Sequence, residues 1–276
     1  MAGFWRWLIG RGREPEPRIE RPQRIDNMSA RLRALAEPCL WLVAGEGGQS
    51  RLAGAPDMNA VWPRYQGRPM AFLAQLDLKE MRVSSGPDWL PGEGRLLFFY
   101  EFEHGSWGLD PEDAGSAVVL YETDAAPTAD APNDLPSDMR FEAYPVAFVR
   151  GLSTCAERLE AHHGPFSDAE RRAVDMVVEE MAPAEPSHQV GGYAGPIQND
   201  DMEWQCEAVS RKLASGEARR GHQKQDAADW RLLLQIDTDD EAGMMWGDMG
   251  RLYFWVREQH ARAGDFSRSW TILQCH

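Results

Sequence analysis

The sequence predicts an α+β fold of mostly antiparallel β-sheet, in which an internally duplicated hairpin unit supplies the strands and a few helices lie at the periphery. The first observation is a repeated pair of strand patterns: FLAQLD at 72–77 returns as LLLQID at 232–237, and GRLLFF at 94–99 returns as GRLYFW at 250–255. The second is that predicted strands outnumber predicted helices and do not alternate with them regularly, which disfavours a parallel sheet. Each half of the chain is therefore expected to carry a strand, a loop and a second strand.

The first residues predict a tail that precedes the fold. Residues 14–24 are dense in Pro, Glu and Arg and have no hydrophobic period. We therefore expect a flexible N-terminal tail over 1–26 and a single domain over 27–276. Within that domain, the two internal repeats are placed at about 52–122 and 188–275.

The domain is expected to begin with a helix and a strand. Met28, Leu32 and Leu35 recur at the spacing of one helix face, which predicts a short helix over residues 27–37. The apolar residues that follow predict a strand over 39–44.

The remaining strands of the first half follow the same reasoning. Alternating or continuous apolar residues predict strands over 72–77, 95–103, 116–121 and 141–149. Pro145 lacks a backbone N–H, so we expect it either to place the last of these strands at a sheet edge or to split it.

The second half is expected to contain two helices and three strands. Ser167 and Glu170 form a capping box ahead of an apolar stripe that continues to Met181, which predicts a helix. A Gly- and Pro-rich loop over 183–199 and a second amphipathic helix over 200–213 follow. The strands are predicted over residues 230–236, 251–256 and 269–275.

The chain is acidic, with 29 Lys and Arg residues against 44 Asp and Glu residues and a formal net charge of −15. This charge repels phosphate backbones and anionic lipid headgroups, so we expect no nucleic-acid partner. A protein partner with a basic surface fits the charge better. The apolar run at residues 4–9 is too short to cross a bilayer, so stable membrane insertion is not expected.

The cysteines predict a reducing compartment. They lie far apart and form no C-x-x-C pair, so neither a zinc site nor a redox motif is indicated. We expect reduced thiols and a cytoplasmic location. The four residues are Cys39, Cys155, Cys206 and Cys275.

Several motifs, in their order along the chain, carry a resemblance to a known family. They are LAGAPD at 52–57, FLAQLD at 72–77, GRLLFF at 94–99, HQVGGY at 188–193, LLLQID at 232–237 and WGDMG at 246–250. Together they resemble the YwqG-like family, a bacterial domain of unknown function, although Ala55 stands where the family usually has a second Gly or Ser. The resemblance implies an α+β fold with internal duplication and a cytosolic setting. Because some members lie near toxin and immunity genes, it also implies an immunity-like binding role.

The repeated glutamines are candidates for a ligand site. Gln75 and Gln235 fall inside apolar strands, where an amide is costly to bury unless it is hydrogen-bonded. In a structural interpretation each amide bridges backbone groups, and Asp77 and Asp237 cap the loops that follow. In a functional interpretation the two amides line a ligand cleft between the repeats.

A second candidate is the segment that begins at His188. This histidine precedes the Gly191-Gly192-Tyr193 loop, whose backbone amides could hold an anion or a carboxylate. The alternative is a loop histidine that is hydrogen-bonded to carbonyl groups. The candidate ligand-binding residues are therefore Gln75, Asp77, His188, Tyr193, Gln235 and Asp237.

The acidic loop that follows the second LLLQID strand is a candidate metal site. The positions of its carboxylates along the chain are similar to those of the ligands in a calcium loop, which allows a Ca²⁺ or Mg²⁺ site at this turn. Ala242 stands where an EF-hand loop needs glycine, so an EF-hand is not expected, and a solvated acidic turn is the alternative. The candidate ligands are Asp237, Asp239, Glu241 and Asp248.

No catalytic motif such as G-x-S-x-G, a Walker loop or G-x-G-x-x-G occurs, so the sequence favours a binding protein over an enzyme. We expect it to recognise a protein partner through an acidic cleft between the repeats or through the acidic loop. The alternative is a small-ligand receptor or an enzyme, in which Gln75, Gln235, His188 and Asp237 converge on one pocket between the repeats. The acidic loop and the His188 segment occur once only, so a specific site is expected where the repeats differ.

Overall fold

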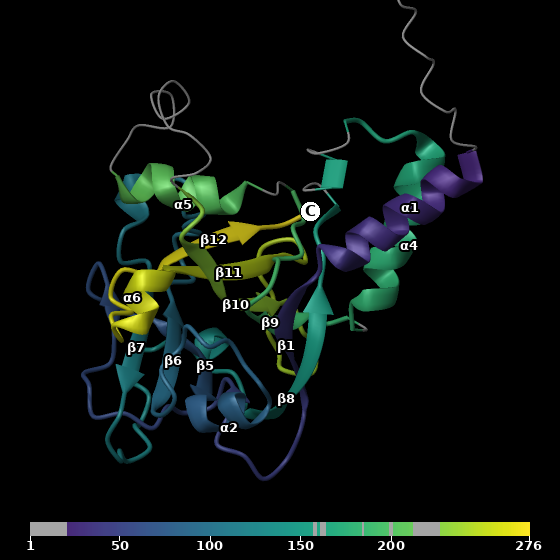
Figure 1. The fold of residues 1–276 in the computed structure, drawn as a ribbon. Coiled ribbons are helices and arrows are strands. Elements are labelled where there is room, and N and C mark those ends of the chain that lie inside the picture. Colours follow the sequence, from purple (N-terminus) through teal and green to yellow (C-terminus); the bar gives the residue numbers. More distant parts are fainter. Residues whose placement is uncertain (1–20, 157–158, 161–163, 184, 199–200, 212–226) are drawn as a thin grey trace, which may run out of the picture.

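The protein is organised around one ten-stranded sheet with helices on its outside (Figure 1). The computed structural model describes residues 21–156, 159–160, 164–183, 185–198, 201–211 and 227–276. Every strand pairing in this part of the chain is antiparallel. The predicted α+β class with a mainly antiparallel sheet is therefore confirmed.

One end of the sheet contains, in order, β2 (Arg51–Leu52), β5 (Ala71–Asp77), β6 (Arg95–Tyr100) and β7 (Ala117–Glu122). The other end contains β12 (Trp270–Gln274), β11 (Arg251–Arg257), β10 (Trp230–Asp237) and β9 (His188–Val190). β9 lies within residues 183–199, which the sequence predicts as a loop, because a strand of three residues is too short to show a period. A separate small hairpin joins β3 (Arg64–Tyr65) to β4 (Arg68–Pro69).

The middle of the sheet is formed by β1 (Glu37–Ala44) and β8 (Tyr144–Ser153). β9 pairs with β1, and β2 pairs with β8. β8 is therefore not at a sheet edge, although it contains Pro145. It does change partners beside this proline: residues 146–153 pair with β1, and residues 144–145 pair with β2.

The two long hairpins, β5 with β6 and β10 with β11, have the same irregularity. In β5 the register shifts between Phe72 and Ala74, and in β10 it shifts between Leu232 and Leu234. A β-bulge of this kind bends a strand and increases its twist. Both bulges therefore bend the sheet just before the buried glutamines of the two repeated motifs.

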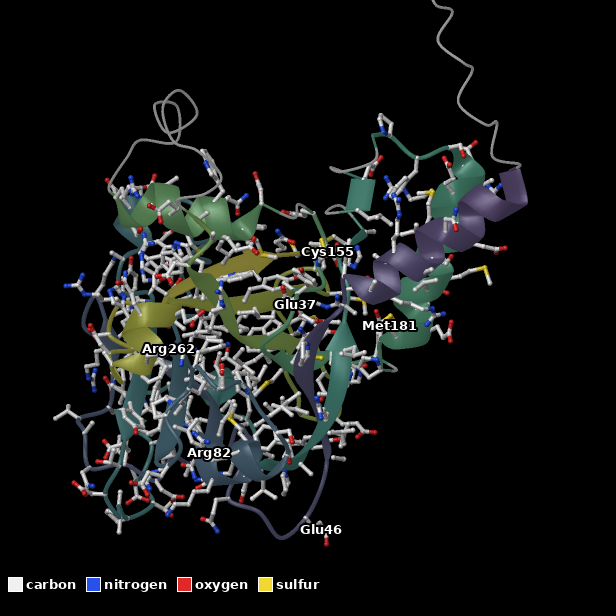
Figure 2. The ribbon with its side chains drawn as sticks, in the orientation of Figure 1. Glu37, Glu46, Arg82, Cys155, Met181 and Arg262 are labelled. Atoms are coloured by element: carbon white, nitrogen blue, oxygen red, sulfur yellow. The ribbon has the colours of Figure 1, made fainter. Side chains whose placement is uncertain are left out.

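The sheet curves into a nearly closed barrel, and side chains fill the space that it encloses (Figure 2). The ring centroids of Phe98 on β6 and Phe254 on β11 lie 5.1 Å apart, so the two hairpins face each other across the interior. At the open seam, Tyr121 on β7 contacts Phe266, with ring centroids 5.6 Å apart. The backbone N–H of Leu273 on β12 donates to the carbonyl of Trp107 at 3.1 Å, which closes the seam further.

The predicted amphipathic helices form, with different bounds. α1 (Arg21–Ala34) begins six residues before the predicted start at 27, so residues 21–26 of the expected tail are helical. α4 (Asp168–Met181) follows the predicted capping box, in which the Ser167 N–H donates to Glu170 Oε2 at 2.8 Å. α1 and α4 pack against each other through Met28, Leu32, Val174 and Val177.

Among the described residues, α2 (Leu78–Val83), α5 (Met202–Ser210) and α6 (Glu258–Arg262) also lie outside the sheet. α5 matches the helix predicted over 200–213, of which residues 200, 212 and 213 lie outside the described part. α2 and α6 have no predicted counterpart, because helices this short show no hydrophobic period. In the described ranges, no helix combines the length and the apolar character needed to span a bilayer.

Candidate functional site

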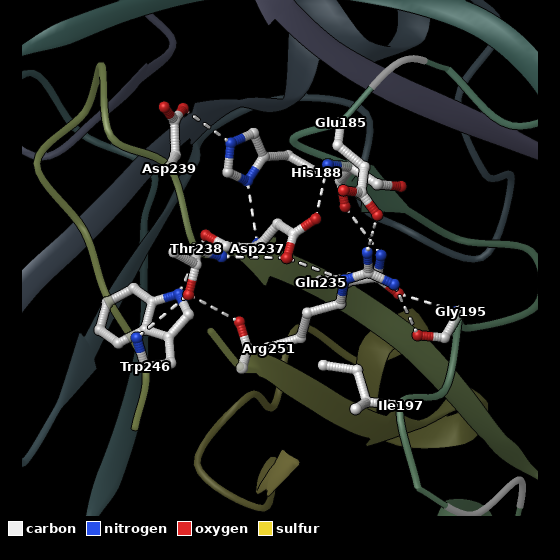
Figure 3. A network of polar contacts seen from close by, with 12 residues as sticks. Glu185, His188, Gly195, Ile197, Gln235, Asp237, Thr238, Asp239, Trp246 and Arg251 are labelled. Atoms are coloured by element: carbon white, nitrogen blue, oxygen red, sulfur yellow. Dashed lines mark hydrogen bonds and ion pairs between the residues drawn. The ribbon is translucent and has the colours of Figure 1, made fainter. Parts of the chain in front are cut away.

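Gln235 on β10 is buried and ties together the two segments that flank β9 (Figure 3). Its Oε1 accepts a hydrogen bond from the backbone N–H of Gly195 at 2.9 Å. Its Nε2 donates to the backbone carbonyl of Ser187 at 2.7 Å. The amide therefore holds the chain on both sides of β9, as the structural interpretation of this residue predicts.

Gln75 on β5 does the same around β2. Its Oε1 accepts from the backbone N–H of Asp57 at 2.9 Å, and its Nε2 donates to the carbonyl of Gln49 at 3.1 Å. Partial burial raises the pKa of Asp57, but hydrogen bonds from Thr128 and Gln75 and the Arg51 charge together bring it below its ordinary value. Gln75 is thus part of a polar network of its own and is not joined to Gln235.

Asp77 at the end of β5 caps a helix. Its Oδ1 accepts from the backbone N–H groups of Lys79 at 2.9 Å and Glu80 at 3.0 Å, which satisfies the first donors of α2. The backbone N–H of Asp77 donates to Ser50 Oγ at 2.9 Å. This aspartate therefore stabilises the start of α2 and binds no group from the second half in the described contacts.

Asp237 at the end of β10 lies between a cation and two backbone donors. Its Oδ1 accepts from Arg251 Nε at 2.8 Å and from the Thr238 N–H at 3.0 Å, and its Oδ2 accepts from the Ser187 N–H at 2.8 Å. Arg251 also donates to the carbonyl of Gly195 at 3.1 Å. The Asp237 carboxylate is thus engaged by protein donors on both oxygens.

His188 on β9 bridges β10 and the acidic loop (Figure 3). Its Nδ1 accepts from the backbone N–H of Asp237 at 3.1 Å, so the imidazole proton belongs on Nε2, which lies 3.1 Å from Asp239 Oδ2. The side chains of His188 and Asp239 are each only 3% exposed. The hydrogen bond from His188 lowers the pKa of Asp239 below its ordinary value. The ring of His188 therefore contacts a carboxylate and a backbone N–H. The alternative interpretation predicts hydrogen bonds to carbonyl groups, and the described contacts of this ring include none.

The acidic loop, residues 238–250, is built around a buried tryptophan. Trp246 is almost fully buried, and its Nε1 donates to the carbonyl of Asp237 at 3.0 Å. The Trp246 N–H donates to Thr238 Oγ1 at 3.2 Å, and this hydroxyl donates to the carbonyl of Gly250 at 2.9 Å. The two ends of the loop are therefore fastened to each other and to β10.

The outer side of loop 238–250 is both acidic and apolar. Met245 is 51% exposed and Met249 is 61% exposed. Met249 has a φ of +47°, a left-handed conformation that is unfavourable for a residue other than glycine. Exposed carboxylates lie beside these methionines along the loop, at Asp240, Glu241 and Asp248.

The four candidate metal ligands, Asp237, Asp239, Glu241 and Asp248, do not gather around one point. Asp237 pairs with Arg251, Asp239 with His188, and Glu241 Oε2 accepts from the Tyr144 hydroxyl at 2.9 Å. Asp248 is exposed. Across the ranges that the structure describes, no group of three or more His, Cys, Asp or Glu residues is placed to hold a metal ion. The geometry therefore gives no support to the predicted calcium or magnesium site.

The Gly191-Gly192-Tyr193 loop donates two of its backbone N–H groups to other parts of the protein. The Tyr193 N–H donates to Ser153 Oγ at 2.7 Å, and the Gly191 N–H donates to the carbonyl of Leu232 at 3.0 Å. The carbonyl of Tyr193 accepts from Gln189 Nε2 at 2.7 Å. These two N–H groups are consequently not available for the anion that the sequence allows at this loop.

Comparison with known protein families shows to which family the chain belongs. The sequence model described as "Domain of unknown function (DUF1963)" matches residues 50–275, which is most of the chain. The chain belongs to this family. No curated protein matches it.

The match to DUF1963 covers both hairpins and both buried glutamines but begins after β1. β1 nevertheless lies in the middle of the sheet, between β9 and β8. In this DUF1963 chain, a strand outside the matched region is therefore needed to complete the sheet that carries the site.

The structure brings together only part of the predicted site. His188, Gln235 and Asp237 share one network, while Gln75 and Asp77 belong to the network around β2. The prediction of one pocket shared by all of the candidate residues is therefore not supported by these contacts.

Sequence reasoning missed three residues that hold the site together, namely Arg251, Trp246 and Ser187. A signal for two of them was present, since Arg251 is the arginine of the repeated Gly-Arg motif and Trp246 opens the WGDMG motif. Ser187 acts through its backbone groups, which carry no sequence signal.

The cysteines give no support to a thiol nucleophile. All four remain as thiols and are buried. Burial raises the pKa of the Cys39 thiol to about 12 and also raises that of Cys206. Because the thiolate is the reactive form, neither residue is suited to nucleophilic chemistry at neutral pH.

Proposed function

We propose that this DUF1963 protein is a non-catalytic, cytoplasmic binding protein that holds a protein partner with a basic surface on the outer side of loop 238–250. The observation that carries the proposal is the exposure of Met245 and Met249 next to Asp240, Glu241 and Asp248 on one fastened loop. Methionine is common on binding surfaces because its flexible thioether adapts to different partners. The carboxylates, with a chain net charge of −15, favour a cationic partner.

The rigidity of the loop supports this proposal. Its ends are held by Thr238 and Gly250, and its centre is anchored by the buried Trp246. A loop that is already ordered loses little conformational freedom when it binds, so more of the contact free energy appears as affinity. The left-handed Met249 fits the same proposal, since strained backbone conformations cluster at active sites and ligand-binding segments.

We also infer that the regions at about 52–122 and 188–275 arose by duplication of one unit, as in the YwqG-like proteins that the motifs resemble. Three features support this inference: the matching bulges in β5 and β10, the matching bridges made by Gln75 and Gln235, and two successive left-handed residues after each short strand. These residues are Ala53 and Gly54 after β2, and Gly191 and Gly192 after β9. Under this inference, loop 238–250 is the part of the second unit that acquired a separate role.

A binding measurement with a defined probe tests the proposed function. The probe is a helical peptide of about 18 residues with Lys on one face and Leu on the other, titrated at about 0.15 M salt. We expect binding to the native protein and at least about tenfold weaker binding by the M245S/M249S variant, because each buried methionine contributes roughly 1.5–3 kcal/mol.

The matched control is the V61S/V83S variant. Val61 is 89% exposed and Val83 is 87% exposed, and neither is part of the loop. This variant should bind the peptide like the native protein. Equal losses in both variants, or no peptide binding at all, would refute the proposed interface.

A further inference from the structure

A short chain of hydrogen bonds connects the end of β10 with loop 238–250. The backbone N–H of Asp237 donates to His188 Nδ1, and His188 Nε2 donates to Asp239 Oδ2, both at 3.1 Å. Both side chains in this relay are buried. The imidazole therefore accepts from the strand and donates to the first carboxylate of the loop.

The first half of the chain contains the same relay with a different central residue. The backbone N–H of Asp77 donates to Ser50 Oγ at 2.9 Å, and Ser50 Oγ donates to Glu80 Oε2 at 2.6 Å. Here one hydroxyl oxygen both accepts and donates, and the receiving carboxylate lies on α2. Because the two nitrogens of His188 lie on different sides of a ring, the second relay spans a longer path than the first.

The carboxylate that receives the second relay shapes the turn before Met245. Asp239 Oδ1 accepts from the backbone N–H groups of Glu241 at 2.8 Å and Ala242 at 3.2 Å. The backbone of Asp239 also exchanges two hydrogen bonds with Met244, at 2.8 and 2.9 Å. The orientation of the Asp239 side chain thus determines the turn that leads directly to the exposed methionine.

We propose that His188 is the positioning residue for the binding face of loop 238–250: through Asp239 it holds the turn that presents Met245. The inference rests on the proposed function for its consequence but not for its geometry. His188 lies beneath the loop, is almost completely buried and contributes no exposed atom group to the face itself. Its effect on a partner is therefore transmitted through Asp239.

Hydrogen–deuterium exchange of the unliganded protein tests the positioning role. In H188A we expect amide exchange over residues 239–246 to rise about tenfold or more, while β10 and β11 keep their native protection. H188Q should lie closer to the native protein than H188N, because an amide nitrogen at the end of Gln can take the place of Nε2 toward Asp239. Asn can replace only the Nδ1 acceptor.

The D239A variant tests the same contact from the side of the loop. If the two residues act as one unit, the double variant H188A/D239A should show the same loop exchange as either single variant. If the effects of the two substitutions multiply, or if loop exchange in H188A and H188Q equals that of the native protein, the proposal is wrong. H188Q and D239A also keep the test decisive if H188A fails to fold.

The S50A variant is the matched control in the first half. It should raise exchange around α2 and leave loop 238–250 unchanged. Binding of the Lys/Leu peptide is measured on the same samples, and H188A is expected to bind about tenfold more weakly. Faster loop exchange without any peptide binding, even by the native protein, would refute the proposed function alone. Unchanged loop exchange would refute the positioning role alone.

Discussion

At the scale of single residues, the two repeated glutamines form separate bridges in the two halves of the chain. Gln75 and Gln235 each satisfy one backbone N–H and one carbonyl on either side of a short strand. Such a bridge replaces the main-chain pairing that a strand of two or three residues cannot supply. This explains why an amide is present inside an otherwise apolar strand.

We expect Gln235→Leu to destabilise the protein by about 2–4 kcal/mol, because it removes the partner of the buried Ser187 carbonyl and of the partly buried Gly195 N–H. Urea unfolding of the native and variant proteins measures the difference. Gln259→Ala is the control, since this residue is exposed on α6 and should change stability by less than about 0.5 kcal/mol. A Gln235→Leu protein as stable as the native one would contradict the bridging role.

The candidate site was predictable at the residue scale only in part. The repeated Gln-x-Asp motif made Asp237 a candidate, and the Gly191-Gly192-Tyr193 loop made His188 one. Asp239 was a candidate because the carboxylates of its segment have a spacing similar to that of a calcium loop. It could not show that His188 binds Asp239, since the two are separated by 51 positions in the chain. Carboxylates that are close in sequence likewise point to different partners, so the contacts of the described residues give no support to the predicted metal site.

At the scale of the elements, short segments differ most from the prediction. β9 has three residues and α6 has five, so neither shows the periodicity on which sequence reasoning depends. The longer elements with clear caps or apolar runs, such as α4 and β10, occur where the sequence predicts them. Local pattern therefore determines an element when the element is long enough to repeat it.

The turn after β9 provides a prediction at this scale. Gly192 has a φ of +67°, and a Cβ there would lie 2.2 Å from Ser153 Oγ and 3.0 Å from Cys39 Cβ. We expect Gly192→Ala to cost about 2–4 kcal/mol, from backbone strain together with the displaced neighbours.

The control for this change is Gly115→Ala. Gly115 has a φ of +87° but no atom within 4 Å of the added Cβ, so only strain of about 1 kcal/mol is expected. Thermal unfolding of both variants measures the difference. Similar losses in the two proteins would show that contact with β1 and β8 is unimportant at Gly192.

At the scale of the whole molecule, the two hairpins depend on one shared interior. Phe98 and Phe254 meet between them, and β1 and β8 connect the two ends of the sheet. β1 pairs with β9 of one hairpin end, and β8 pairs with β2 of the other, so the two ends of the sheet are joined only through β1 and β8 in the strand order. We therefore expect the two halves to unfold together.

Phe254→Ala tests this dependence. Removal of a buried phenylalanine should cost about 3–5 kcal/mol, and hydrogen exchange should become faster in β5 and β6 as well as in β10 and β11. Val61→Ala, at a residue 89% exposed, is the control and should leave both hairpins unchanged. Faster exchange confined to β10 and β11 would mean that the halves are independent.

The sequence by itself determined the α+β class, the longer strands and helices and the two repeated hairpin motifs, because these depend on local apolar patterns. It also indicated that the acidic loop of the second half has no counterpart in the first half. Only the tertiary structure decided that β1 and β8 lie between the two ends of the sheet, and that His188 reaches Asp239 beneath the loop. The physical reason is that these contacts join residues far apart in the chain, and their geometry arises only when the sheet has curved.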